Sequence, residues 1–329
     1  MNPKLAEVCP GIYEIFLPLP ARPSIVNVYL VDCGGAWALI DTGMNSAESF
    51  QVLEHALHEA GTRIEALDAL IATHHHPDHF GASAEIQRRS RARIYIHELE
   101  LECARRTLAY SRGQSADSSV WQAFFHANGF PIERYPDAMR PVWMDGGLYQ
   151  PTLTPNAFIK DRDVIQIGHR SFEVIWTPGH SPGHNMLYLA REKILIAGDH
   201  LLPKITPHVG FHPGGAPNPL KDFLDSQRKM QGLEVDWVLP AHGGVFHDHR
   251  GRARELIEHH RRRESEMLEV IRREPMSAFE IANHVFGGER PVFHVMMATF
   301  ETLAHLEYAH QQGRIRKSER GERVLYQSV

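Results

Sequence analysis

The sequence predicts an α/β fold with a smaller domain at its C-terminal end. Short apolar runs alternate with stretches whose apolar residues recur at helical spacing, a pattern typical of sheets covered by helices. After Gly251 the pattern changes to a highly charged helix, where a second domain is expected to begin. The chain has 329 residues, of which 43% are hydrophobic, enough for a sizeable core. The expected domains are residues 1–250 and 251–329.

The expected strands are short runs of apolar, β-branched or aromatic residues bounded by turns. They cover residues 24–31, 37–40, 69–73, 93–96, 172–176, 186–189, 194–197 and 237–239. The first two are joined through Gly34 and Gly35, a pair that favours a tight turn.

Expected helices lie between these strands. The helix at about residues 46–60 has Phe50, Leu53 and Leu57 at helical spacing, and Gly61 fits its C-terminal stop. The others begin near Gly81 or cover about residues 98–110, 120–128 and 220–230.

Residues from about 98 to 160 interrupt this alternation. Two expected helices are followed by a proline- and glycine-rich stretch at residues 129–155. A long segment without a clear pattern inside a domain is often a lid or specificity insertion. The alternative, given equal weight, is that this segment only packs irregularly on the surface of the domain.

Composition favours a cytoplasmic protein. The amino terminus lacks the basic start and apolar run of a secretory signal, and no run approaches the roughly 18 apolar residues that span a bilayer. Cys9, Cys33 and Cys103 form no CxxC pair, as suits a reducing compartment. The net charge of −5 gives no electrostatic reason for tight non-specific binding to nucleic acid.

Histidine occurs 23 times, and its densest group is the run THHHPDH at residues 73–79, directly after an expected strand. In an extended loop, His74 and His76 point the same way and His75 points elsewhere, because side chains alternate. Neutral imidazole suits Zn²⁺ and related transition metals.

The last residues of the THHHPDH run indicate a second metal ion. Pro77 breaks any regular continuation and can redirect Asp78 and His79 toward another metal, which a carboxylate can also bridge. A polar surface loop is the alternative for any single histidine.

Four further short motifs follow expected strands, so one edge of the sheets could gather them all. They are DTG at residues 41–43, TPGHSPGH at 177–184, AGD at 197–199 and PAHG at 240–243. Proline and glycine fix a tight path that presents His180 at a strand end. Asp41 could orient a ligand from behind it.

In this order the five motifs resemble the metallo-β-lactamase superfamily over about residues 10–250, and HxHxDH is its most specific motif. The resemblance implies an αββα sandwich with the site at its edge. It implies no ligand role for His184, so a supporting or structural part is expected there. The implied ligands are His74, His76 and His180 for the first metal, Asp78, His79 and His242 for the second, and Asp199 as the bridge.

Two divalent ions are therefore expected. Zinc suits the imidazole and carboxylate ligands, with iron and manganese as alternatives, since no cysteine thiolate is present in the motifs. A hydroxide bridging the metals would attack a carbonyl or phosphorus centre, while one ion stabilises the developing charge. Asp78 and Asp199 are the expected catalytic carboxylates, and Asp78 could also help to manage the proton.

The segment after Asp199 bears on the substrate. It resembles a stretch of hydroxyacylglutathione hydrolase-like proteins, so Lys204, His208 and His212 are candidate substrate contacts, with a surface loop as the alternative. The leading hypothesis is hydrolysis of a small ester, thioester or lactone. A non-hydrolytic redox or binding member is disfavoured, because no length remains for a flavodoxin-like domain and all seven ligand positions are filled.

The C-terminal tail carries the second hypothesis. Short helices, a longer helix at about residues 292–312 and a two-stranded wing turning at Gly321 resemble the winged-helix tail of β-lactamase-like proteins that include endoribonucleases. Arg314, Arg316 and Lys317 weakly favour a phosphodiesterase acting on RNA. The favoured alternative is that the tail packs on the catalytic domain, walls the pocket or forms a homodimer.

Overall fold

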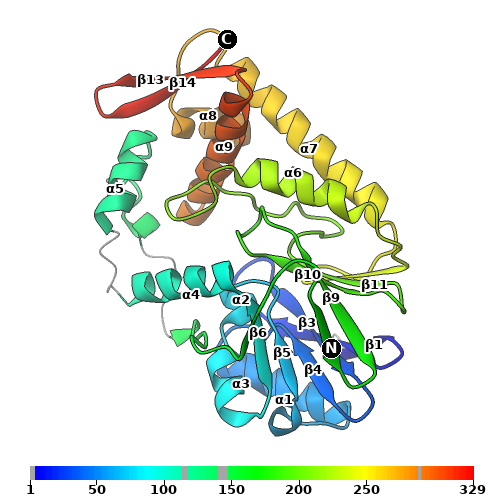
Figure 1. Ribbon diagram of the computed structural model, residues 1–329. Coiled ribbons are helices and arrows are strands. Elements are labelled where there is room, and N and C mark those ends of the chain that lie inside the picture. Colours follow the sequence, from blue (N-terminus) through cyan, green and yellow to red (C-terminus); the bar gives the residue numbers. More distant parts are fainter. Residues whose placement is uncertain (1–3, 113–117, 140–146, 288–289) are drawn as a thin grey trace.

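Two β-sheets stacked face to face carry helices on their outer faces (Figure 1). This computed structural model describes residues 4–112, 118–139, 147–287 and 290–329. The layers confirm the expected α/β sandwich, in which helices cover sheets whose inner faces meet.

The first sheet has seven strands in the order in which they follow along the chain. Strands β1 to β4 pair antiparallel, and β4 to β7 pair parallel. Their bounds are β1 Leu5–Cys9, β2 Ile12–Pro18, β3 Ile25–Asp32, β4 Trp37–Ile40, β5 Ala69–Ile71, β6 Arg93–His97 and β7 Ala157–Ile159.

The second sheet has five strands in the order β12-β11-β10-β9-β8. Only β11 and β12 pair parallel. Their bounds are β8 Val164–Ile167, β9 Arg170–Trp176, β10 Asn185–Leu189, β11 Ile194–Gly198 and β12 Trp237–Pro240.

Alternation along the strands distributes apolar side chains between the layers. In β3, Val28 and Leu30 pack under the helices of the first sheet, whereas Tyr29 and Val31 pack between the sheets. Strands β10 and β11 alternate likewise between the centre and the helices of the second sheet. Because both faces are covered, these strands are largely apolar, as the sequence predicts.

Helices α1, α3 and α4 cover the first sheet, and α6 and α7 cover the second. Ser46 caps α1 by accepting a hydrogen bond from the Ser49 backbone, and Gly61 follows it with φ +84°. The helix bounds are α1 Ala47–Glu59, α2 Pro77–Phe80, α3 Ser83–Arg89, α4 Glu98–Ser111, α5 Ser118–Ala127, α6 Pro219–Met230, α7 His249–Val270, α8 Ala278–Phe286 and α9 Val292–Gln311. Two 3₁₀ turns cover Ile64–Ala66 and Pro136–Met139.

The C-terminal elements gather away from the sheets, at the top of Figure 1. Helices α7, α8 and α9 enclose an apolar cluster with the antiparallel pair β13 (Ile315–Arg320) and β14 (Arg323–Ser328). The hairpin turns at Gly321, which has φ +62°. The helices and hairpin expected in the tail are therefore present, and the winged-helix assignment and the boundary at residue 250 stay predictions.

Some elements differ from those expected. The helix expected near Gly81 is α3, whereas the short helix α2 before it and strands β1, β2, β7 and β8 were not expected. Residues 98–112 and 118–127 are mostly helical as α4 and α5, while residues 140–146 of the expected loop stretch lie outside the described residues. Among the described residues, no helix combines the length and apolar character needed to cross a membrane.

Candidate metal centre

The ends of four strands converge at one edge of the sandwich, and each leads to part of the histidine and carboxylate set. The loop after β5 carries His74 and His76, and Pro77 then starts α2, which presents Asp78 and His79. The ends of β9, β11 and β12 lead into His180, Asp199 and His242.

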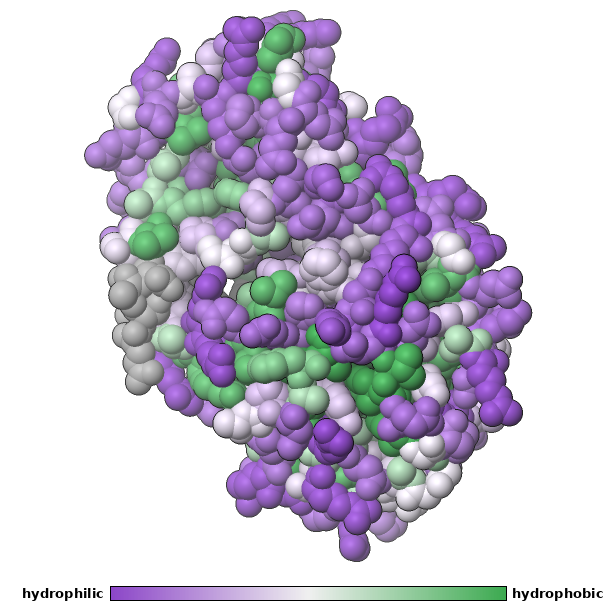
Figure 2. Space-filling view, viewed as in Figure 1, coloured by the Kyte–Doolittle hydropathy of each residue, from purple (hydrophilic) through white to green (hydrophobic). Residues whose placement is uncertain are grey.

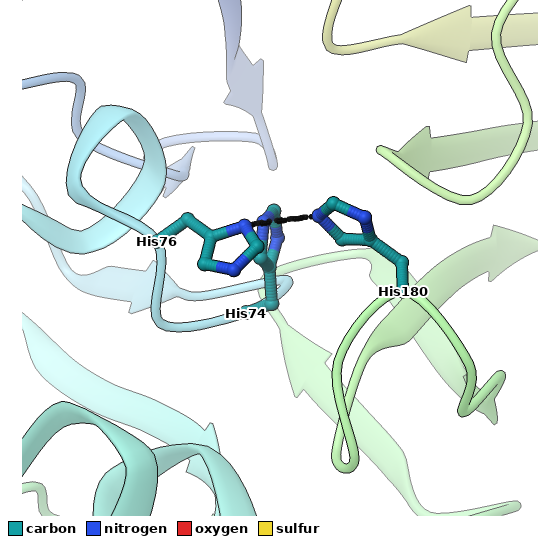
Figure 3. Close-up of side chains that lie close together, drawn as sticks. All are labelled: His74, His76 and His180. Atoms are coloured by element: carbon teal, nitrogen blue, oxygen red, sulfur yellow. Dashed lines mark hydrogen bonds between the residues drawn. The ribbon is translucent and has the colours of Figure 1, made fainter. Parts of the chain in front are cut away.

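Three imidazoles form the first group of converging atoms (Figure 3). The His180 Nε2 atom lies 2.9 Å from His76 Nδ1 and 3.3 Å from His74 Nε2. His74 Nε2 and His76 Nδ1 are 3.0 Å apart. Nitrogens that share a tetrahedral zinc ion at ~2.0–2.1 Å lie roughly 3.3 Å from one another, so this triangle fits such an ion.

A second group joins Asp78, His79 and His242. The Oδ2 atom of Asp78 lies 3.4 Å from His242 Nε2 and 3.7 Å from His79 Nε2. These atoms come from α2 and from the segment directly after β12.

Asp199 lies between the two groups. Its Oδ2 atom is 3.6 Å from His180 Nε2 and 3.5 Å from His79 Nε2, and its Oδ1 atom is 3.5 Å from His242 Nε2. One carboxylate therefore reaches a histidine of the first group and both histidines of the second. The position suits a bridge between two cations.

Two atoms of this set are buried without a hydrogen-bond partner among the described residues: His79 Nε2 and Asp199 Oδ1. An unpaired buried polar atom is costly, and a metal ion would satisfy both. Burial also holds the pKa of His74 and His76 well below the ordinary value, with neighbouring imidazoles adding to the shift. Both rings are therefore neutral, as metal binding requires. The donor set fits divalent transition metals.

Asp41 contacts His79 and Thr73 on the side of these residues that faces away from the converging ligand atoms. Its Oδ2 atom lies 2.9 Å from His79 Nδ1 and accepts a hydrogen bond from the Thr73 hydroxyl, and its Oδ1 atom accepts one from the Thr73 backbone. The Thr73 hydroxyl in turn lies 3.0 Å from His74 Nδ1. Asp41 has φ +63°, an uncommon backbone conformation for a non-glycine residue. The structure thus brings Asp41 into contact with His79 and with Thr73, while its orienting role stays a prediction.

Main-chain carbonyls hold the remote nitrogens of two other histidines. His180 Nδ1 lies 2.8 Å from the His208 carbonyl oxygen, and His242 Nδ1 lies 2.8 Å from that of Ile25. A carbonyl only accepts, so each Nδ1 carries the hydrogen and each Nε2 is left with its lone pair toward the centre.

The other residues singled out in the sequence lie around this core. His184 is fully buried, with Nδ1 2.9 Å from the Thr177 hydroxyl and Nε2 accepting from the Asp199 backbone, a structural position. His208 contributes its carbonyl to His180, and burial lowers the pKa of its side chain to about 3. His212 stacks on Trp121 of α5 with ring centroids 5.8 Å apart. Lys204 is exposed on the same segment.

The molecular surface is hollowed between α4 and the segment that leads to α6 (Figure 2). That segment contains Lys204, His208 and His212. Lys204 is exposed on this segment, whereas His208 and His212 are partly buried.

Sequence reasoning missed Glu100, which is fully buried at the start of α4. It bonds to His75, the one histidine of the THHH run that points away from the centre, with His75 Nδ1 2.5 Å from Glu100 Oε2. No local pattern singles out this carboxylate, because a glutamate in the first turn of a helix is ordinary.

Comparisons with known proteins agree on one family. The family model described as "Metallo-beta-lactamase superfamily" matches residues 21–242. The solved structure of a metallo-beta-lactamase family protein from Thermus thermophilus is 32% identical, with a TM-score of 0.83 over 98% of this chain and 100% of that one.

Two curated relatives bear names of hydrolases. A "Probable metallo-hydrolase YqjP" of Bacillus subtilis is 24% identical over 97% of this chain and 98% of its own length. The human "Acyl-coenzyme A thioesterase MBLAC2" is 27% identical over 53% of this chain and 57% of its own length.

Proposed function

This chain belongs to the metallo-β-lactamase superfamily, and on that premise we propose that it uses two divalent metal ions to hydrolyse a small ester, thioester or lactone. The observation that carries the proposal is the position of Asp199, whose two oxygens face histidines of both converging groups. A carboxylate placed in this way supports two cations in one site.

His74, His76 and His180 would hold one ion, Asp78, His79 and His242 the other, and Asp199 both. Bound divalent ions lower the pKa of a coordinated water toward neutrality and polarise a substrate oxygen. Burial keeps His74 and His76 neutral, while Asp41, Thr73 and main-chain carbonyls fix the orientation of the ligand rings. Asp78 is the more accessible carboxylate, with 20% of its side chain exposed against 12% for Asp199, so it faces an incoming substrate more directly.

Carbonyl substrates are favoured over phosphodiesters by the surroundings of the centre. His212 stacks on the aromatic ring of Trp121, and Lys204 is the only lysine or arginine between Asp199 and His212. A relative named as an acyl-coenzyme A thioesterase supports the thioester member of the class. Zinc is the proposed metal, because neutral imidazole and carboxylate suit it.

The test is a panel of thioesters, lactones and a phosphodiester, assayed with metal-loaded protein and with His76→Ala. The variant removes one of three nitrogens of the first group, so we expect its turnover of the carbonyl substrate to fall at least ~100-fold. Metal content of both proteins, measured by elemental analysis, should fall in parallel. Phosphodiester cleavage without turnover of any carbonyl substrate would refute the proposal.

The RNA hypothesis receives less support from the tail. Two of its basic side chains are already paired: Arg314 donates to Glu264, and Lys317 donates to Glu307. Arg316 and Arg320 stay exposed on the hairpin. The phosphodiester arm of the panel decides whether these residues serve a nucleic acid.

A further inference from the structure

One buried carboxylate outside the ligand set connects the two loops that carry the first metal group. Glu100 lies at the start of α4 and is fully buried. Its Oε2 atom accepts a hydrogen bond of 2.8 Å from the His75 backbone and lies 2.5 Å from His75 Nδ1. Its Oε1 atom accepts one of 2.6 Å from the Gly183 backbone.

These three bonds reach both sides of the site. His75 lies between His74 and His76, and Gly183 lies three residues after His180. The two loops are more than 100 residues apart in the sequence, so a single side chain fixes a distance that no local interaction can set. The Tyr149 hydroxyl donates to the His75 carbonyl and holds the same loop from another side.

Gly183 lies so close to α4 that a larger residue would not fit there. A Cβ atom at Gly183 would lie 2.7 Å from His97 Nδ1 and 3.0 Å from Glu100 Cγ. Only glycine leaves room for the carboxylate to reach the backbone N–H at this point.

The negative charge of Glu100 strengthens its hydrogen bonds to His75 and Gly183. Burial alone would raise the pKa of the Glu100 carboxyl, but His75 and the hydrogen bonds it donates hold that pKa below its ordinary value. The group is therefore an ionised acceptor, and hydrogen bonds to a charged acceptor are about twice as strong as neutral ones.

We infer that Glu100 is a positioning residue, which sets the separation of His74 and His76 from His180 and so the metal affinity of the first group. The inference rests on the proposed function, since it concerns metal binding at that centre. It also connects α4, at the start of the expected insertion, to both loops that carry the ligands of the first group.

The test replaces Glu100 by glutamine, which keeps the shape but offers one acceptor oxygen where the carboxylate offers two. At least one of the three donors then loses its partner. We expect the affinity for Zn²⁺, measured by competition with a chelator, to fall 10- to 100-fold. The absorption spectrum of the Co²⁺-loaded variant should change as the ligand geometry loosens, and kcat should fall more than KM rises.

Glu264→Gln is the matched control. Glu264 is a buried carboxylate that accepts two hydrogen bonds from Arg314, between α7 and the segment before β13. Its loss should lower the Tm of the metal-free protein without changing Zn²⁺ affinity or the Co²⁺ spectrum. A purely structural Glu100 would behave in the same way.

Unchanged Zn²⁺ affinity in Glu100→Gln, with metal bound normally by the unaltered chain, would overturn this inference and leave the proposed function intact. An unaltered chain that binds no metal would refute both. If Glu100→Gln does not fold, His75→Ala decides, because it removes one donor and keeps both backbone bonds. About 10-fold weaker Zn²⁺ binding in His75→Ala supports the inference, and unchanged binding contradicts it.

Discussion

Buried carboxylates in this protein differ in the donors around them. Asp41 and Glu100 each lie against several N–H or O–H groups, which compensate for the loss of water. Glu14 of β2, only 4% exposed, has the Tyr29 hydroxyl 3.1 Å from its Oε1 atom as the hydrogen-bond donor. Burial therefore raises the pKa of Glu14 from 4.5 to about 7, against the opposing effect of Tyr29.

This shift predicts a pH-dependent stability. Because the folded state favours the neutral carboxyl, Glu14 has no effect below pH 4.5, and the protein loses stability as the pH rises from 4.5 to about 7. Glu14→Gln cannot ionise, so the variant should gain stability relative to the unaltered protein over that range. The gain should reach at most about 3 kcal/mol at neutral pH.

Denaturant unfolding of both proteins at about pH 5 and about pH 8 measures the difference. Glu85→Gln is the control, because burial has little effect on this carboxylate, which pairs with Arg88 at the surface. A Glu14→Gln advantage that is equal at both pH values would contradict the expected titration.

At the scale of elements, the loop after β9 packs directly on α6. Gly179 has φ +138°, and a Cβ atom there would lie 2.5 Å from the Cα atom of Phe223. Phe223 is fully buried in the apolar cluster between α6 and the second sheet. The path that presents His180 thus depends on the absence of a side chain one residue earlier.

Gly179→Ala should therefore push the loop away from α6. We expect a loss of about 2 kcal/mol or more in the free energy of unfolding, from backbone strain and overpacking together. Thermal unfolding measures it. Gly244→Ala is the control, because Gly244 also lies near a histidine of the centre but a Cβ there meets no atom within 4 Å. Equal Tm values for both variants would show that the contact with Phe223 is unimportant.

The same elements show what could be predicted from the sequence. Strands buried on both faces, such as β5 and β11, are apolar throughout and were expected. Strand β2 was not expected, because Glu14 interrupts its apolar run. The burial of Glu14 depends on Tyr29 from the next strand. The same contrast holds at the site: local spacing identifies His74, His76 and Asp78, whereas Glu100 acquires its role only when α4 meets two distant loops.

Across the whole molecule, α7 connects the sandwich with the C-terminal elements. Near its start, Ala253 and Leu256 are fully buried among residues of the second sheet and α6. Towards its end, Met267 packs with α8, α9 and the hairpin. The surface over these C-terminal elements is largely hydrophilic in the view shown (Figure 2).

Truncation after residue 250 should consequently damage the sandwich itself. It removes Ala253 and Leu256 from that cluster, and each buried leucine contributes roughly 1.5–3 kcal/mol. We expect the shortened chain to aggregate or to bind a hydrophobic dye. Limited proteolysis and light scattering, compared with the full chain, measure the outcome. A soluble fragment that binds metal with a Tm within a few degrees of the full chain would contradict this expectation.

The hydrogen bonds to His180 and His242 have a consequence for how such a protein can diversify. Their acceptors are the main-chain carbonyls of His208 and Ile25, which any amino acid supplies. Side chains on the segment that leads to α6 can therefore be exchanged without altering the tautomer of His180. The proposed substrate contacts Lys204 and His212 can thus vary while His180 keeps its orientation toward the centre.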